Sequence, residues 1–131
     1  MSSASHLPIQ YWPTKPFITD IYRKRMVMMM ITTHADWFRR DDLTWVSKNY
    51  HIWEAFEREA DLIWNNGRRH YSARTIIEFL RHETAIKEKS ADGWKINDHA
   101  TPSLARLYML MHPDRSSFFE RRPGGSGTRV Q

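Results

Sequence analysis

Five consecutive residues near the middle of the chain combine cationic, aromatic and hydroxyl side chains in a pattern that suits a phosphate group. They are Arg68, Arg69, His70, Tyr71 and Ser72. Ser72 is a suitable N-cap residue, and the N-terminus of the helix expected after it presents free amide donors and the positive end of the helix dipole. Guanidinium groups and helix-end amides both donate to phosphate oxygens. We therefore expect this segment to contact a nucleic-acid backbone.

Three further arginines extend this basic set. Arg74 and Arg81 are seven residues apart, and so lie on nearly one side of a helix, whereas Arg106 belongs to a later helix. A structural use competes with binding, because Arg74 and Arg81 can pair with Glu78 and with acids of the preceding helix. The predicted nucleic-acid contacts, and DNA contacts in particular, are Arg68, Arg69, His70, Tyr71, Ser72, Arg74, Arg81 and Arg106.

Metal and catalytic patterns are weaker. His82-Glu83 begins like the zinc motif H-E-x-x-H, but Ile86 stands where the second histidine is needed. Glu78 and His82 are one helical turn apart, and a hydrogen bond between them is the simpler expectation. The chain has no cysteine, no nucleophile elbow, no P-loop and no dinucleotide-binding glycine motif. We therefore predict that it is not an enzyme and holds no metal or cofactor.

These side chains must be positioned by helices. Apolar residues recur at helical spacing from Ile52 to Trp64, which predicts an amphipathic helix over residues 48–65 that ends at Asn65-Asn66-Gly67. The acids of this helix, together with Arg58, are expected on its solvated face. They are Glu54, Glu57, Glu59 and Asp61.

Two more helices follow. A second apolar stripe predicts a helix from Ser72 to about Lys87, and Thr101-Pro102 predicts the start of a third, which must end near His112 because Pro113 follows. Between them, residues 94–96 alternate in the manner of a short strand or an extended strap. The fold class is mainly α, a small bundle of at least three helices with a helix-turn-helix-like pair around Gly67.

The charge is unevenly distributed along the 131 residues. The net charge is +5 and the sequence pI about 9.7, but the excess lies in residues 1–30, 62–82 and 115–131. We expect residues 1–40 to be extended or poorly ordered, residues 41–120 to form the helical domain, and residues 121–131 to be a disordered tail. The basic strip at 62–82 therefore carries the argument for nucleic acid better than the pI does.

The first 40 residues leave several interpretations open. Residues 18–33 contain the run MVMMMI, which fits a helix or a buried strand, and the methionines up to Met30 also permit an over-long gene prediction upstream of them. Prolines interrupt the N-terminal segment where a signal peptide needs a continuous apolar stretch, and no run approaches the length of a membrane span. We expect a cytoplasmic protein with no membrane partner.

Over more than half of its length, from Asn49 to Arg122, the chain resembles a group of small bacterial and bacteriophage proteins, most of which have no assigned function. The residues that carry the resemblance are the segments HIWEAF (51–56), HYSARTIIE (70–78), LRHET (80–84), KIND (95–98), LAR (104–106) and FFER (118–121). The resemblance implies a cytoplasmic protein of bacterial or phage origin. It transfers no catalytic residue.

A protein-interaction module is the alternative function. The chain has six tryptophans, more than three short helices need, and aromatic residues with arginine are typical interface anchors. The candidate anchors are Trp37, Phe38, Trp45, Phe118 and Phe119. A homodimer, or a phage protein that binds and blocks a host factor, would have this composition.

Overall fold

The described residues form five α-helices and two short 3-10 turns. The computed structural model describes residues 18–87 and 94–119. The elements are α1 (Ile18–Thr33), η3 (Ala35–Trp37), α2 (Asp42–Lys48), α3 (Tyr50–Asn65), α4 (Ala73–Lys87), α5 (Ala100–Met111) and η4 (Pro113–Arg115). The predicted mainly α bundle is confirmed.

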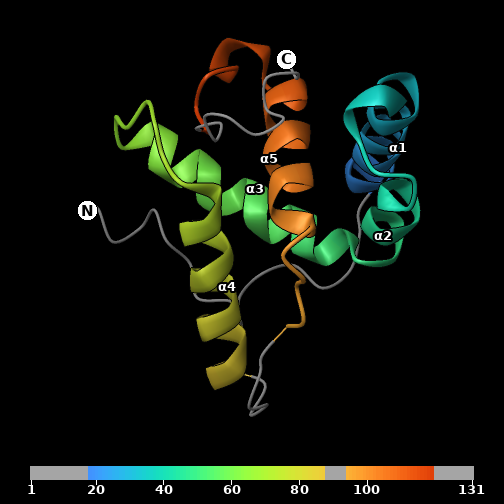
Figure 1. Ribbon diagram of the computed structural model, residues 1–131. Coiled ribbons are helices and arrows are strands. Elements are labelled where there is room, and N and C mark those ends of the chain that lie inside the picture. The colour runs from blue at the N-terminus through green and yellow to red at the C-terminus, as the bar shows by residue number, and fades with distance from the viewer. Residues whose placement is uncertain (1–17, 88–93, 120–131) are drawn as a thin grey trace.

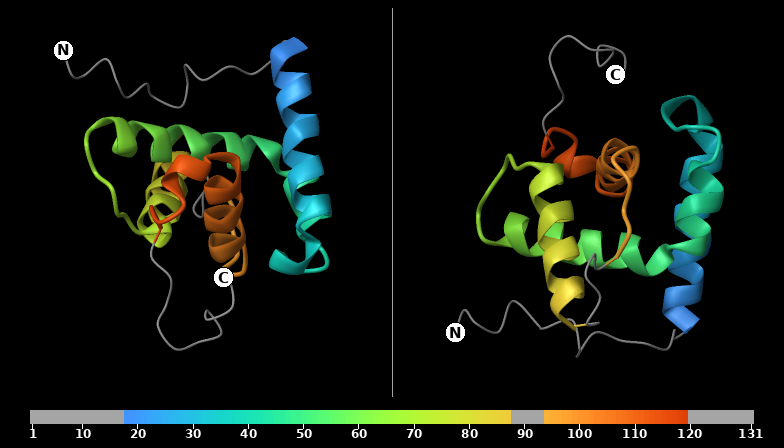
Figure 2. Two further views of the ribbon diagram at one scale, coloured as in Figure 1. Left: turned by 90° about the horizontal axis from the view of Figure 1, so that it is seen from above. Right: turned by 60° about the horizontal axis from the view of Figure 1, so that its bottom comes forward.

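The helix α3 runs through the middle of the molecule (Figures 1 and 2). It is in contact with α2, α4 and α5, and α1 lies against α2 and α5. The pair α1–α2 sits at one end of α3, and the turn into α4 sits at the other end (Figure 2). The two ends of α3 therefore support two separate surfaces.

One hydrophobic core joins these helices. Trp53 and Phe56 of α3 are fully buried with Leu104, Leu107 and Tyr108 of α5. Helix α4 contributes three more buried side chains, Ile76, Ile77 and Leu80. This packing confirms the apolar stripes that the sequence predicted for α3, α4 and α5.

The local capping signals are confirmed in part. The Ser72 hydroxyl accepts a hydrogen bond from the amide of Thr75 at 3.2 Å, so it caps α4 as expected. The third predicted helix begins at Ala100, and its N-cap residue, His99, makes no side-chain capping bond. The Asn97 side chain accepts a hydrogen bond from the Ala100 amide at 3.1 Å, so the first turn starts one residue before the predicted Thr101.

The predicted boundary at residue 41 is wrong. Of the interpretations open for residues 18–33, the structure has a helix, and Val27 and Ile31 of that helix are buried in the core. Burial of these side chains against α5 and α2 explains why the segment is ordered. The expectations for residues 1–17 and 120–131 lie outside the described residues.

Of the two alternatives open for this segment, the structure has the extended strap, at residues 94–97, and not the short strand. The Trp94 amide donates to the Thr84 hydroxyl at 2.8 Å, and the Ile96 side chain of the strap is buried in the core. The described part of the chain contains no strand, and its isolated β-bridge joins Tyr71 to Phe119. Among the described residues, no helix is long and apolar enough to span a bilayer.

Candidate functional site

Residues 66–74, which comprise the connection between α3 and α4 and the start of α4, hold most of the predicted contact residues, and we call them the arginine turn. Gly67 has a φ of 100°, a backbone conformation that residues with a Cβ atom rarely adopt. Its amide donates to the Trp64 carbonyl at 2.9 Å, and the Arg68 amide donates to the Ile63 carbonyl at 3.3 Å. These bonds close the end of α3 and direct the chain outward at Arg68.

Two guanidinium groups of the arginine turn rest on aromatic rings. Arg68 lies over Tyr71 at 5.9 Å, and Arg69 lies over Trp64 at 3.9 Å. Arg69 also donates to the Trp64 carbonyl at 2.9 Å. Both arginines are exposed, and neither forms a salt bridge with a carboxylate of the described residues. Stacking orients the two cations without neutralising them.

The arginine turn is fixed to the end of the described chain. The Tyr71 amide donates to the Phe118 carbonyl at 2.9 Å, and a ring nitrogen of His70 lies 3.2 Å from the Ser117 carbonyl. Phe118 is fully buried and packs against Trp64 with ring centres 5.5 Å apart. The backbone of the turn is therefore held against the core, although its arginines are exposed.

The two predicted arginines of α4 differ in their environment. Both lie near the same carboxylate, since Glu78 is 3.7 Å from Arg74 and 3.6 Å from Arg81. The Arg74 side chain is 65% exposed and the Arg81 side chain only 29%. Arg81 also donates to the Ile96 carbonyl and lies 3.7 Å from Asp98. The structural alternative therefore describes Arg81 well, because this side chain fastens the strap to α4.

Helix α5 adds little to a binding surface. Ser103, on the helix that carries the predicted contact Arg106, is buried and donates to the Asp42 carboxylate at 2.6 Å. Arg106 is half-buried on the same helix. The structure thus leaves Arg68, Arg69 and Arg74 exposed within the arginine turn, and it assigns Arg81 to the strap.

A second group of polar residues lies where the sequence predicted a solvated face. Glu57 is only 8% exposed and Glu59 only 7%, so the expectation of a fully hydrated acidic face on α3 is wrong. The residues around Glu57 form what we call the polar cluster. Its members are Arg23 of α1, Glu57 and Asp61 of α3, Tyr108 and His112 from the end of α5, and Arg115 of η4.

Hydrogen bonds connect the polar cluster throughout. Arg23 pairs with Glu57 through its guanidinium, and a ring nitrogen of His112 lies 2.8 Å from the same carboxylate. Asp61 accepts hydrogen bonds from the Tyr108 hydroxyl at 2.7 Å and from Arg115 at 2.9 Å. Helices α1, α3 and α5 are therefore joined through two carboxylates.

These contacts shift ionisation equilibria. Burial by itself raises the pKa of Glu57, but hydrogen bonds from His112 and Arg23 outweigh it, so the pKa lies below its ordinary value. Burial raises the pKa of Tyr108, and its hydrogen bond to Asp61 raises it further. Both shifts favour the protonation states that the cluster needs at neutral pH, an ionised Glu57 and a neutral Tyr108.

Three members of the polar cluster have the chemistry of metal ligands. Atoms of Glu57, Asp61 and His112 lie within 4.8 Å of one another. However, Arg23 and Arg115 already balance the two carboxylates, and a cation would have to displace them. We therefore interpret the cluster as an ion-pair network. The spacing of Glu57 and Asp61 on one helical turn is the sequence signal that could have indicated it.

Most of the predicted interface aromatics are used by the core. Phe118 and Phe119 are buried, and Phe38 and Trp45 pack partly against the core. Trp37 is the exposed member of the predicted set, at 41%.

Comparison of the chain with protein-family models, curated proteins and solved structures gives no match.

Proposed function

We propose that the chain binds the phosphate backbone of nucleic acid through the arginine turn. The observation that carries the proposal is the exposure of Arg68 and Arg69 on aromatic rings, without a carboxylate partner among the described residues. Arg74 adds a third exposed guanidinium in the first turn of α4. One guanidinium nitrogen of Arg69 donates to the carbonyls of Trp64 and Arg68, and the other N–H groups of the two ring-stacked guanidiniums can donate to phosphate oxygens.

The binding proposed here contacts the backbone and does not depend on a reading helix in the major groove. The connection between α3 and α4 spans residues 66–72, longer than the three or four residues typical of a helix-turn-helix. Ser103 is buried, and so it is unsuited to base contacts. Phosphate contacts alone bind without strong sequence preference, so duplex DNA and RNA both need testing.

A salt titration with matched variants tests this function. Affinity for a labelled DNA duplex and a labelled RNA of equal length is measured by fluorescence anisotropy between about 50 and 200 mM salt. We expect the Arg68→Ala/Arg69→Ala chain to bind at least about tenfold more weakly and with a salt slope lower by about two.

The control has the same change in charge elsewhere on the surface. Arg39 and Arg40 are also adjacent and exposed, but they precede α2, at the other end of α3. Arg39→Ala/Arg40→Ala should leave the affinity within about twofold, if the arginine turn is the contact. Absence of binding at low salt, or equal losses in the two double variants, would contradict the proposal.

A further inference from the structure

The side of α1 that points away from the core is apolar. Its exposed apolar residues are Ile21 (49%), Tyr22 (60%), Met26 (56%) and Met29 (62%). Together with Arg25, which lies at the centre of the same helical side, we call them the outer face. Val27 and Ile31 are buried on the opposite side, and Arg23 and Lys24 lie between the two sides. The described residues cover the side of Val27 and Ile31 and leave the outer face exposed, and an exposed apolar patch of this kind often marks a binding site.

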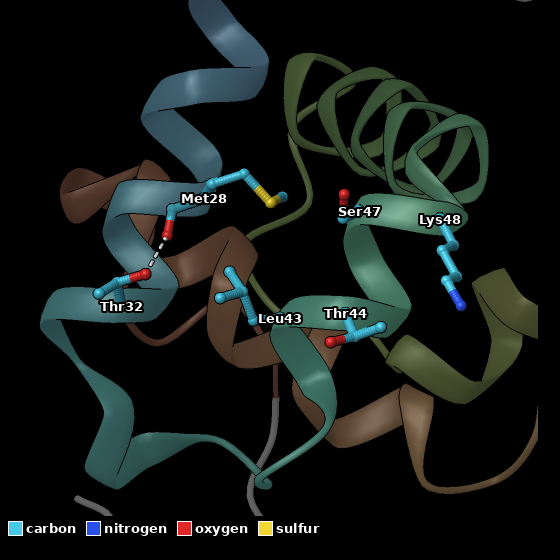
Figure 3. A pocket seen from close by; sticks show the side chains of 6 residues that line it. All are labelled: Met28, Thr32, Leu43, Thr44, Ser47 and Lys48. Atoms are coloured by element: carbon cyan, nitrogen blue, oxygen red, sulfur yellow. Dashed lines mark hydrogen bonds between the residues drawn. The ribbon is translucent and has the colours of Figure 1, made fainter.

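A groove lies between α1 and α2, close to the outer face in sequence, and Figure 3 shows the residues that line it. It has a volume of about 330 Å³. The lining residues are Met28, Thr32, Leu43, Thr44, Ser47 and Lys48. Met28 is three residues from Arg25, and Thr32 is three residues from Met29, so the groove runs along one edge of the outer face. Together they form one apolar surface.

The charges within this surface are positive. Arg25 lies in the outer face, and Lys48 is the charged residue that lines the groove. Neither acid at the start of α2 lines the groove: Asp42 is buried and accepts a hydrogen bond from Ser103, and Asp41 is exposed just before the helix. A partner that covers the surface must therefore bring negative charge as well as apolar side chains.

We infer that this surface binds an acidic amphipathic helix of another protein. Flexible methionine side chains adapt to the apolar side of an incoming helix, and a groove between two helices is a common seat for one. Carboxylates along the edges of that helix would meet Arg25 and Lys48. This interaction is independent of nucleic-acid binding, because the arginine turn lies at the other end of α3 (Figures 1 and 2).

Charge argues against two other occupants. A two-fold contact between two copies of α1, centred on the outer face, would bring Arg25 close to its own symmetry mate, and like charges in contact are unfavourable. Residues 1–17 contain no Asp or Glu and carry Lys15, so they cannot complement the surface either. An acidic partner satisfies both the apolar and the charged residues.

Two synthetic peptides test the inference. Each has about 18 residues with leucines at helical spacing, and the flanking positions are glutamate in one peptide and lysine in the other. Anisotropy with the full chain should show at least about tenfold tighter binding of the glutamate peptide. Arg25→Glu should reduce or reverse this preference, because it inverts the central charge.

Variants locate the binding surface. Met26→Gln/Met29→Gln should lower the affinity for the glutamate peptide at least about tenfold, because the double substitution makes the outer face polar without changing the core. Ile86→Gln is the control, because Ile86 is 57% exposed on α4, away from α1. It should change the affinity less than about twofold. Circular dichroism verifies that all variants are folded.

Every other outcome overturns the inference. Equal binding of the two peptides, or no binding by the full chain, would show that acidic helices are not recognised. Self-association that Met26→Gln/Met29→Gln abolishes would identify a second copy as the occupant. Binding to phosphatidylserine vesicles that competes with the glutamate peptide would identify a lipid surface.

Discussion

The polar cluster and the arginine turn use the same side chain in opposite ways. In the polar cluster, Arg23 and Arg115 each meet a carboxylate of α3, and the Arg115 side chain is only 16% exposed. In the arginine turn, Arg68 and Arg69 rest on aromatic rings and stay exposed, with no such partner among the described residues. The first pair joins helices, and the second pair is available to an external ligand.

This difference indicates that burial of one member of an ion pair decides the use of an arginine: the Glu57 side chain is 11% exposed beside Arg23, and the Arg115 side chain is 16% exposed beside Asp61. A guanidinium in such a pair is held in place, because separating the pair leaves an uncompensated charge in a poorly hydrated site. A guanidinium on a ring at the surface keeps its hydration and can exchange water for phosphate. Four tests, taken in order of expected effect on stability, can break or sharpen this comparison.

Removal of Glu57 should have the largest effect. Glu57→Ala takes the shared acceptor from Arg23 and His112, and we expect a loss of about 3 kcal/mol in the free energy of unfolding. Urea denaturation measures the loss. Glu78→Ala is the matched control, since Glu78 also has two arginine neighbours but a 55% exposed side chain, and it should cost less than about 0.5 kcal/mol. Equal losses would erase the distinction between buried and exposed pairs.

Acid should weaken the polar cluster next. The pKa of Glu57 is lower in the folded chain than its ordinary value of 4.5, so its ionised form stabilises the fold above that pH. As the pH falls below this value and through the folded pKa, this contribution is lost. The urea midpoint should therefore drop between pH 6 and pH 3, and drop less in Glu57→Gln. A steeper pH dependence in the variant would contradict the assignment.

Within α4, Arg81 should matter more for stability than Arg74. Arg81→Ala removes the donor to the Ile96 carbonyl and loosens the strap, at a cost of about 1–2 kcal/mol. Arg74→Ala removes one exposed pair and should cost about 0.3 kcal/mol. Thermal unfolding of the two variants makes the comparison. A larger loss of stability in Arg74→Ala than in Arg81→Ala would mean that other contacts hold the strap.

Among the main variants of the four tests, the double variant of the arginine turn should have the smallest effect on stability. Arg68→Ala/Arg69→Ala should change the free energy of unfolding by no more than about 0.5 to 1 kcal/mol, because both side chains are exposed. The same variant should lose nucleic-acid affinity. A large loss of stability would show that the two arginines serve the fold, and would remove the contrast with the polar cluster.

Sequence reasoning located α3, α4 and α5 to within about two residues, because their signals are local. The Ser72 cap and the left-handed Gly67 are decided by neighbouring residues. It did not predict that residues 18–33 form an ordered helix, because the run MVMMMI fits a helix and a strand equally well. It also missed the polar cluster, because His112 and Arg23 reach Glu57 from distant parts of the chain.

The amino-acid sequence by itself determined the helical class, the apolar stripes and the position of the basic turn, since each depends on spacing within one helix or turn. Only the tertiary structure decided which charges are buried. Glu57 is on the polar side of its own helix, yet Arg23 and His112 cover it, and Arg81 resembles Arg74 in sequence but is covered by the strap. Burial depends on which distant segments pack against a residue, and that information is not local.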